Sequence, residues 1–346
     1  CYKKLNMSKK NSSVQNLKIL FKKDKKIVEI YQVFKKNINT FNKKKSFIVG
    51  VSGGPDSLSL CALMKTFSNE TKVKVFYVLI DHGIRKNSNK EAKQVRALLK
   101  KKNIVLTIIK NKEKINKNIQ GRAREIRYKL LSIFSKKNNA KYILTAHHSD
   151  DQIETFLIRL SRGSGIQGLS SMKKITKLND ETSLIRPLLD LKKKDLKYLA
   201  KIFFGKVFKD PSNNNTKYLR TRIRALRRKF DKTGIRHDQI IRSIKNLASA
   251  NETLNGYIDK IFKKNVQSKK NEVLINFQNI SQENFEIQLR VLSTAIKNFT
   301  KTYYPPRSKK IKNLVNLLTS AKQKKLTLSG CILEKSGKYL SIKKEA

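Results

Sequence analysis

The chain has 346 residues, 38% hydrophobic and 30% charged, which is enough for two domains and a sizeable core. Its 79 lysines and arginines against 25 acidic residues give a net charge of +54, which favours a polyanionic partner such as nucleic acid, although much of the lysine could be solvated background. The three cysteines are far apart, which excludes a zinc ribbon or a disulfide framework. No apolar run approaches the roughly 18 residues of a membrane helix, which excludes a membrane span. We therefore expect a soluble, cytoplasmic protein.

Residues 1–45 are rich in lysine and asparagine and are expected to form a basic N-terminal extension. Apolar residues at 17–21 and 27–31 predict a leading helix or two within it. The first methionine is Met7, so residues 1–6 could precede the native start.

Short β-branched runs alternate with segments of helical spacing from residue 46 onwards. The predicted strands are 46–51, 73–80, 104–109 and 141–146. The predicted helices are 56–67, 90–102, 119–136 and 149–161. This alternation indicates an α/β fold: a doubly wound, mainly parallel five-stranded sheet of order 3-2-1-4-5, with helices on both faces.

The pattern changes near residue 235, which divides a first domain at 46–235 from a smaller, mostly helical domain at 236–346. Helices are expected at 238–264, 282–299 and 308–321. The tail, with apolar runs at 326–333 and 337–342, is expected to close as a hairpin.

The stretch SGGPDS follows the first predicted strand and opens the first helix. Its glycines allow close approach of the backbone, its free N–H groups suit an anion, and Asp56 could hold a magnesium ion. The loop has no lysine, so it is not a Walker A sequence, and an ordinary strand-to-helix loop is the plainer alternative. SGGPDS resembles the SGGxDS loop of N-type ATP pyrophosphatases. This resemblance implies binding of the ATP pyrophosphate by Ser52, Gly53, Gly54, Pro55, Asp56 and Ser57.

A second polar set follows the fourth predicted strand, in AHHSDDQIET. On a helix His147, Asp151 and Glu154 would share a face, and the two carboxylates would repel each other unless a cation lay between them. Because strands 1 and 4 are predicted neighbours, this set should lie beside SGGPDS, with the sequence DHGIR at the end of strand 2. The remaining histidine, His237, is expected to be structural or on the surface.

Taken together, several motifs resemble those of the tRNA(Ile)-lysidine synthases. They are SGGPDS, DHGIR, NIQGRAREIRY, AHHSDDQIETFLIRLSRGSGIQGL, IRPLL, and DPSN followed by RTRIR, in that order between about 46 and 230. The resemblance implies a Rossmann-like PP-loop fold. It also implies a reaction: ATP adenylates the C2 oxygen of the wobble cytidine in a tRNA with a CAU anticodon and pyrophosphate leaves, then free L-lysine attacks C2 and AMP leaves.

The resemblance further implies roles for individual residues. Asp56 would act with Mg²⁺, and His147 would contact the α-phosphate. Asp151 and Glu154 would hold the lysine ammonium, and one of them could accept a proton. Arg127 would steady the activated cytidine, or is a helix-surface arginine. Contacts with tRNA phosphates would come from Arg220, Arg222 and Arg224, and from the C-terminal domain.

Two other functions remain open at this point. A tRNA thiolase-like member of the same superfamily would act on tRNA as well, but that chemistry normally uses cysteine pairs, which this chain lacks. A non-catalytic RNA-binding protein would explain the charge and would not need the carboxylates or His147. A homodimer is one oligomeric state that the sequence permits.

Overall fold

The computed structural model describes residues 21–345, apart from gaps at 22, 43, 86, 116–118, 207, 209–218, 231–232, 303–305 and 321–324. The chain forms two compact units, Cys1–Lys245 and Asn246–Ala346. The boundary between them falls within one long helix, α10 (His237–Asn265). None of the described helices combines the length and the hydropathy that a membrane span requires.

The first unit is built on a six-stranded sheet of order β3-β2-β1-β4-β6-β5. Its strands are β1 (Ser46–Val51), β2 (Val75–Asp81), β3 (Leu106–Lys110), β4 (Ala140–Leu144), β5 (Ile175–Lys177) and β6 (Ser183–Ile185). All neighbours are parallel except β5, which runs antiparallel to β6 at the edge. The predicted mainly parallel α/β sheet is confirmed, with β1 beside β4. The predicted number of five strands is wrong, because the short edge strand β5 adds a sixth.

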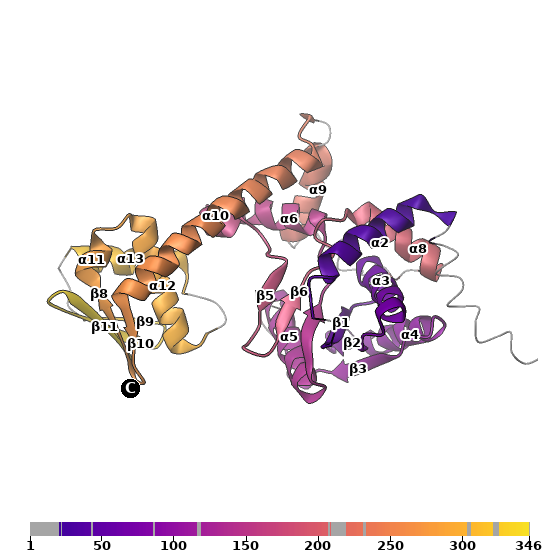
Figure 1. Ribbon diagram of the computed structural model, residues 1–346, viewed down its shortest axis with the longest axis horizontal. Coiled ribbons are helices and arrows are strands. Elements are labelled where there is room, and N and C mark those ends of the chain that lie inside the picture. The colour runs from indigo at the N-terminus through magenta and orange to yellow at the C-terminus, as the bar shows by residue number, and fades with distance from the viewer. Residues whose placement is uncertain are drawn as a thin grey trace, which may run out of the picture. The chain divides into compact units, whose positions relative to one another are not determined.

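Helices cover both faces of this sheet (Figure 1). The helices of the first unit are α2 (Lys25–Ile38), α3 (Pro55–Thr71), α4 (Ser88–Lys100), α5 (Ile119–Lys137), α6 (Ser149–Leu160), α7 (Ile166–Leu169), α8 (Lys193–Phe204) and α9 (Leu219–Phe230). Of these, α2, α3, α4 and α8 pack on one side of the sheet and α5 on the other. The leading helix expected at 27–31 is part of α2, whereas residues 17–20 lie outside the described residues.

The alternation of side chains along β1 explains the two layers. Phe47 and Val49 point into a large cluster with α2, α3, α4 and α8, whereas Ile48 points into a second cluster formed with α5. Phe34 and Ile38 of α2 are fully buried in the larger cluster. Burial on both faces fixes the sheet's register, because a slip by one residue would exchange the two faces. The ends of the parallel strands are therefore rigid points from which the polar loops extend.

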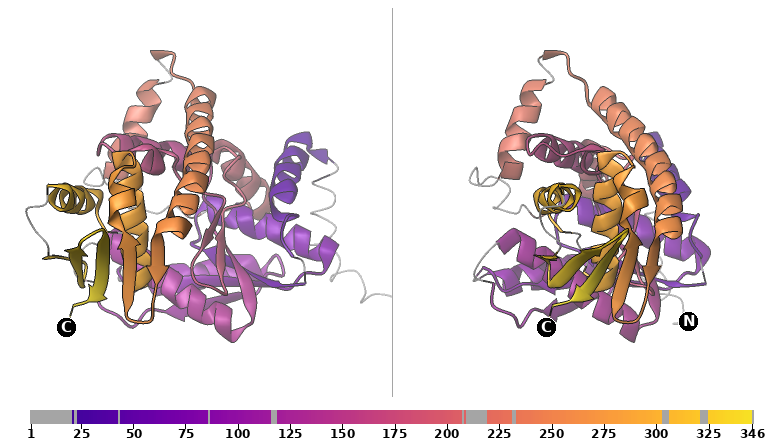
Figure 2. Two further views of the ribbon diagram at one scale, coloured as in Figure 1. Left: turned by 60° about the vertical axis from the view of Figure 1, so that its left-hand side comes forward. Right: turned by 90° about the vertical axis from the view of Figure 1, so that its left-hand side faces the viewer.

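The second unit contains more sheet than the sequence predicted. A five-stranded antiparallel sheet has the order β7-β8-β11-β10-β9. Its strands are β7 (Val266–Ser268), β8 (Glu272–Asn276), β9 (Lys325–Leu328), β10 (Cys331–Ser336) and β11 (Tyr339–Lys344). Figure 2 shows this region in orange to yellow. The helices α11 (Phe277–Ser281), α12 (Phe285–Thr300) and α13 (Ser308–Thr319) accompany it. The prediction of a mostly helical domain is thus corrected. The expected hairpin is present as β10 and β11, but it belongs to a five-stranded sheet in which β11 is the middle strand and β9 an edge.

Candidate active site

Gly53 shapes the loop between β1 and α3. Its φ of +83° lies in the left-handed region, and a Cβ atom there would lie 2.6 Å from Cγ2 of Val95. Both constraints exclude a side chain at this position. The loop closes through Ser57, whose hydroxyl accepts a hydrogen bond from the N–H of Ser52 at 3.2 Å and donates to the carbonyl of Gly54 at 3.0 Å.

The beginning of α3 carries no side-chain cap. Gly54 is its N-cap residue and Pro55 occupies the first turn, so the first-turn N–H groups have no side-chain acceptor among the described residues. Such an end, with the positive end of the helix dipole behind it, suits the oxygens of a phosphate group.

Asp56 lies in the first turn of α3 and has one carboxylate oxygen, Oδ1, that is buried without a hydrogen-bond partner. An orphaned carboxylate oxygen beside a phosphate site fits Mg²⁺, which is held by one or two carboxylates together with substrate phosphates. The described residues contain no group of three or more His, Cys, Asp or Glu side chains arranged for a metal ion. A metal at Asp56 would therefore need the nucleotide's phosphates as further ligands.

The second corner of the site begins with His148 rather than with His147. His148 is the N-cap of α6, its Nδ1 accepts from the N–H of Asp151 at 3.3 Å, and its own N–H donates to Asp151 Oδ2 at 3.1 Å. The helix starts at Ser149, so the prediction that His147 shares a helix face with Asp151 is wrong. His147 lies before the helix, where its Nδ1 is 2.9 Å from the hydroxyl of Thr145.

The two corners meet through His148. Its Nε2 lies 3.5 Å from Asp56 Oδ2 and 3.5 Å from Asp151 Oδ2, and the side chain is 1% exposed. The loop after β1 and the acidic start of α6 are therefore in direct proximity, as the predicted neighbouring of strands 1 and 4 requires.

Charge raises the pKa of His148. Burial by itself lowers this pKa, but the hydrogen bond with Asp56 and the charges of Asp151, Asp56 and Asp150 outweigh burial and hold the pKa above its ordinary value of 6.5. The Nε2–H of His148, which faces Asp56 and Asp151, would link the two carboxylate-bearing corners; full protonation adds a charge, but Nδ1 then no longer accepts from the N–H of Asp151.

Stability should therefore decrease as the pH rises through the pKa of His148. Because the folded-state pKa is raised, the stabilisation is complete below pH 6.5 and is lost above the folded-state value. Between pH 6 and 9 we expect the melting temperature of the wild type to fall more steeply than that of His148→Asn. Asparagine can still cap the helix, so this variant lacks only the titrating group. If the melting temperatures of the two proteins changed in parallel with pH, His148 would not be the group responsible for the pH dependence.

Cationic groups surround the site on the side of His147. Burial, and then the charges of Arg124, Arg186, Arg220 and Arg127, lower the pKa of His147 well below its ordinary value. Its imidazole is therefore neutral at physiological pH, within a positive field that favours a phosphate.

The polar set at the end of β2 lies in the same field. Burial, and then Arg127, lower the pKa of His82 to about 4, and both ring nitrogens are buried without a partner. Arg127, on α5, thus acts on both His82 and His147, while Asp81 accepts a hydrogen bond from the N–H of Gly83 at 3.0 Å.

The cation that the paired carboxylates require comes from α9. Arg220 Nη2 lies 2.8 Å from Asp151 Oδ1, and its Nε lies 2.7 Å from Glu154 Oε2. Arg224 Nε lies 2.7 Å from Glu154 Oε1. Arg220 and Arg224 therefore form ion pairs with carboxylates in the structure, whereas the sequence led us to expect that they contact phosphates of the tRNA. Arg222 is exposed, and the DPSN turn before this helix lies outside the described residues.

Two residues of this neighbourhood were not predicted from the sequence. Arg227 forms an ion pair with Asp150, whose other oxygen accepts from the N–H of Lys193 at 2.8 Å, at the start of α8. Arg220, Arg224 and Arg227 are spaced by four and three residues, which places them on one face of a helix. This spacing was the signal in the sequence from which Arg227 could have been predicted.

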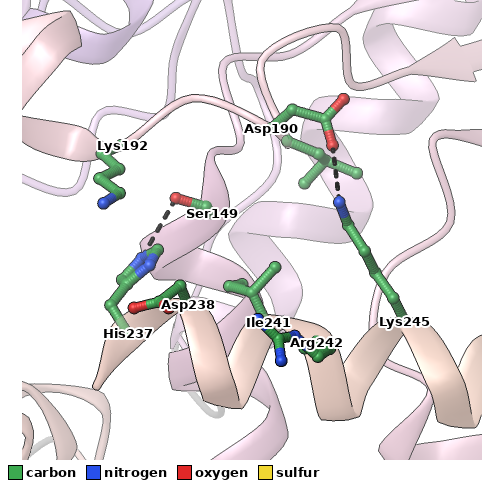
Figure 3. A pocket seen from close by; sticks show the side chains of 9 residues that line it. Ser149, Asp190, Lys192, His237, Asp238, Ile241, Arg242 and Lys245 are labelled. Atoms are coloured by element: carbon green, nitrogen blue, oxygen red, sulfur yellow. Dashed lines mark hydrogen bonds and ion pairs between the residues drawn. The ribbon is translucent and has the colours of Figure 1, made fainter.

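His237 is the second unexpected residue, because it lines a pocket beside α6 (Figure 3). Its Nε2 lies 3.3 Å from the hydroxyl of Ser149 and 3.9 Å from Asp150 Oδ2. Lys192, Arg242 and Lys245 also line this pocket together with Asp190 and Asp238, so its lining carries both positive and negative side chains.

Comparisons with known proteins agree with this geometry. A family model described as a PP-loop domain matches residues 23–228. The tRNA(Ile)-lysidine synthase of Wolbachia pipientis wMel is 37% identical over 303 residues, which cover 86% of this chain and 70% of that protein. The tRNA(Ile)-lysidine synthase of Rhodopseudomonas palustris is 31% identical over 315 residues, which cover 86% of this chain and 90% of that protein.

A solved structure extends the comparison to the fold. The U34-tRNA thiolase NcsA from Methanococcus maripaludis matches 65% of this chain and 79% of its own, with a TM-score of 0.56 and 18% sequence identity. This similarity concerns the fold alone. The sequence matches cover most of the chain, and from them it follows that the chain belongs to the tRNA(Ile)-lysidine synthase family of PP-loop proteins.

Proposed function

We propose that this protein joins free L-lysine to C2 of the wobble cytidine in a tRNA(Ile) with a CAU anticodon. ATP is consumed, AMP and pyrophosphate are released, and the product is lysidine. The observation that carries this proposal is the proximity of the phosphate-type loop and the acidic start of α6, joined by the 3.5 Å contact between His148 and Asp56. One active site can then hold the nucleotide on one side and an amine on the other.

The first step is adenylation of the cytidine. The C2 oxygen attacks the α-phosphate of ATP, the bond to the β-phosphate breaks, and pyrophosphate leaves. The backbone of residues 52–57 and the open end of α3 would bind the leaving pyrophosphate. The neutral imidazole of His147 and the guanidinium of Arg127 would stabilise charge on the α-phosphate.

Magnesium would be held by Asp56 together with the phosphates of ATP. The unpartnered Oδ1 of Asp56 supports this assignment. When bound, the ion would neutralise charge that develops on the pyrophosphate.

The second step is attack by lysine. The lysine amine forms a bond to C2 of the adenylated cytidine, the bond from C2 to the oxygen of AMP breaks, and the amine gives up a proton. Asp151 and Glu154 would first hold the lysine as an ammonium, and one of these carboxylates would then accept the proton. Their position three residues apart on α6 supports a shared role.

Recognition of tRNA would rest on cationic groups outside this centre. Arg222 is exposed on α9, and the net charge of +54 provides a broad attraction to phosphate. The C-terminal unit, which we assign to tRNA binding, would contribute to the same attraction.

A direct assay tests this function. Purified protein, ATP, Mg²⁺, radiolabelled lysine and a CAU-anticodon isoleucine tRNA should yield labelled tRNA, with AMP released in equal amount. A tRNA in which uridine replaces the wobble cytidine is the matched control and should remain unlabelled. Binding of the tRNA without any entry of label would show that the protein is an RNA-binding protein instead.

The thiolase-like alternative finds little support in the described residues. Cys61 lies in the core of the first unit and Cys331 in that of the second, and burial raises the pKa of both thiols. Cys1 lies outside the described residues. Neither described thiol is placed to carry sulfur to the active site.

A further inference from the structure

The two carboxylates assigned to lysine are fully engaged by the chain itself. Glu154 receives Arg220 on Oε2 and Arg224 on Oε1. Asp151 receives Arg220 on Oδ1 and the N–H of His148 on Oδ2. All four oxygens therefore already have a donor. The side chain of Glu154 is 2% exposed, so no open face remains to which an incoming ammonium could add.

The guanidinium of Arg220 lies where the substrate's ammonium would have to lie. It spans both carboxylates, with contacts of 2.8 Å and 2.7 Å. A lysine ammonium held by Asp151 and Glu154 would need the same oxygens. Arg220 and lysine thus compete for one site, and both cannot occupy it.

We propose that Arg220, assisted by Arg224, is an internal stand-in for lysine that must leave the carboxylates before lysine can bind. This inference rests on the proposed function, because it takes Asp151 and Glu154 as the lysine site. The phosphates of the tRNA substrate are the partners that would draw the arginines away. A guanidinium binds phosphate in the same two-pronged manner in which it binds a carboxylate.

The exchange keeps every buried charge paired. Removing an arginine from buried carboxylates without replacement is costly, because it leaves the carboxylates without a counter-charge. When the arginines move to phosphates and lysine moves to the carboxylates, each anion retains a cation. Binding of tRNA and binding of lysine should consequently favour each other, and linkage requires the effect to be equal in both directions.

Lysine binding to the full chain without tRNA or ATP tests the inference. In equilibrium dialysis with radiolabelled L-lysine, Arg220→Gln should bind lysine about tenfold more tightly than the wild type. Addition of the CAU-anticodon tRNA should tighten lysine binding to the wild type and have little effect on the variant. Lys229→Gln removes one positive charge from an exposed position of the same helix and is the matched control, with wild-type affinity expected.

The outcomes separate this inference from the proposed function. If Arg220→Gln binds lysine no more tightly than the wild type, the stand-in role is overturned, even where the wild type still transfers lysine to tRNA. If the variant binds lysine tightly but the wild type never transfers it, the stand-in role holds and the ligase assignment fails. Should Arg220→Gln not fold, as judged by circular dichroism, Arg224→Gln releases one oxygen of Glu154 and must show a smaller gain; no gain overturns the inference.

Discussion

Replacing Asp151 by asparagine is expected to lower the transfer of lysine to tRNA by about 100-fold or more, because a buried carboxylate that would hold the ammonium becomes a neutral amide. Adenylation should be affected much less, since the phosphate loop and Asp56 are unchanged. Steady-state kinetics would show this difference when lysine incorporation and pyrophosphate release are measured on the same preparation.

Asp190→Asn is a matched control for this substitution. Asp190 also forms an ion pair, 2.7 Å from Lys174, but this pair is more exposed and lies outside the proposed chemistry. The control should lose stability without a selective loss of lysine use. Equal losses of adenylation and lysine transfer in Asp151→Asn would refute the assigned role of Asp151.

Gly53→Ala is expected to have the second largest effect, on both stability and ATP use. The new methyl group would meet Val95 at 2.6 Å, and alanine would have to adopt a φ of +83°. Together these should destabilise the protein by about 2 to 5 kcal/mol and displace the N–H groups that are proposed to bind the phosphates. Urea unfolding and ATP-dependent pyrophosphate release would measure the two consequences.

Gly54→Ala provides the comparison within the same loop. The φ of Gly54 is −69°, and a Cβ atom there would have Ser52 Oγ as its nearest neighbour at 3.7 Å. Its free energy of unfolding should stay within about 0.5 kcal/mol of the wild type. If both alanine variants lost equal stability, the special conformation of Gly53 would not explain the result.

The first unit could largely be predicted from the sequence because its signals are local. Apolar strands such as 46–51 lie inside a two-faced core, and their alternation with helices implies a parallel sheet. The edge strand β5 has only three residues, and Ile175 at its start is exposed, so it has no such signal. The sheet of the second unit was missed for a related reason: β8 pairs with β11, more than 60 residues further along the chain.

The candidate site likewise divides into features with a local sequence signal and features that depend on contacts between distant residues. The glycine loop and the acidic start of α6 were identifiable because each occupies a few consecutive residues. The role of His148 was not, because the helix begins at Ser149, two residues after His147, which makes His148 rather than His147 the N-cap residue. The pairing of Arg220 with Glu154 joins residues 66 apart, and in a chain with 79 basic residues the sequence offers no way to select that partner.

The acidic corner formed by Asp56, Asp150, Asp151 and Glu154 has a consequence for a chain so rich in lysine. With only 25 acidic residues against 79 basic ones, such a corner would attract almost any cation of its own chain during folding. Arg220, Arg224 and Arg227, all on α9, instead form specific ion pairs with three of these carboxylates. The carboxylates at the start of α6 are therefore neutralised by fixed partners within the fold, and the surplus of lysine elsewhere in the chain is not needed for this purpose.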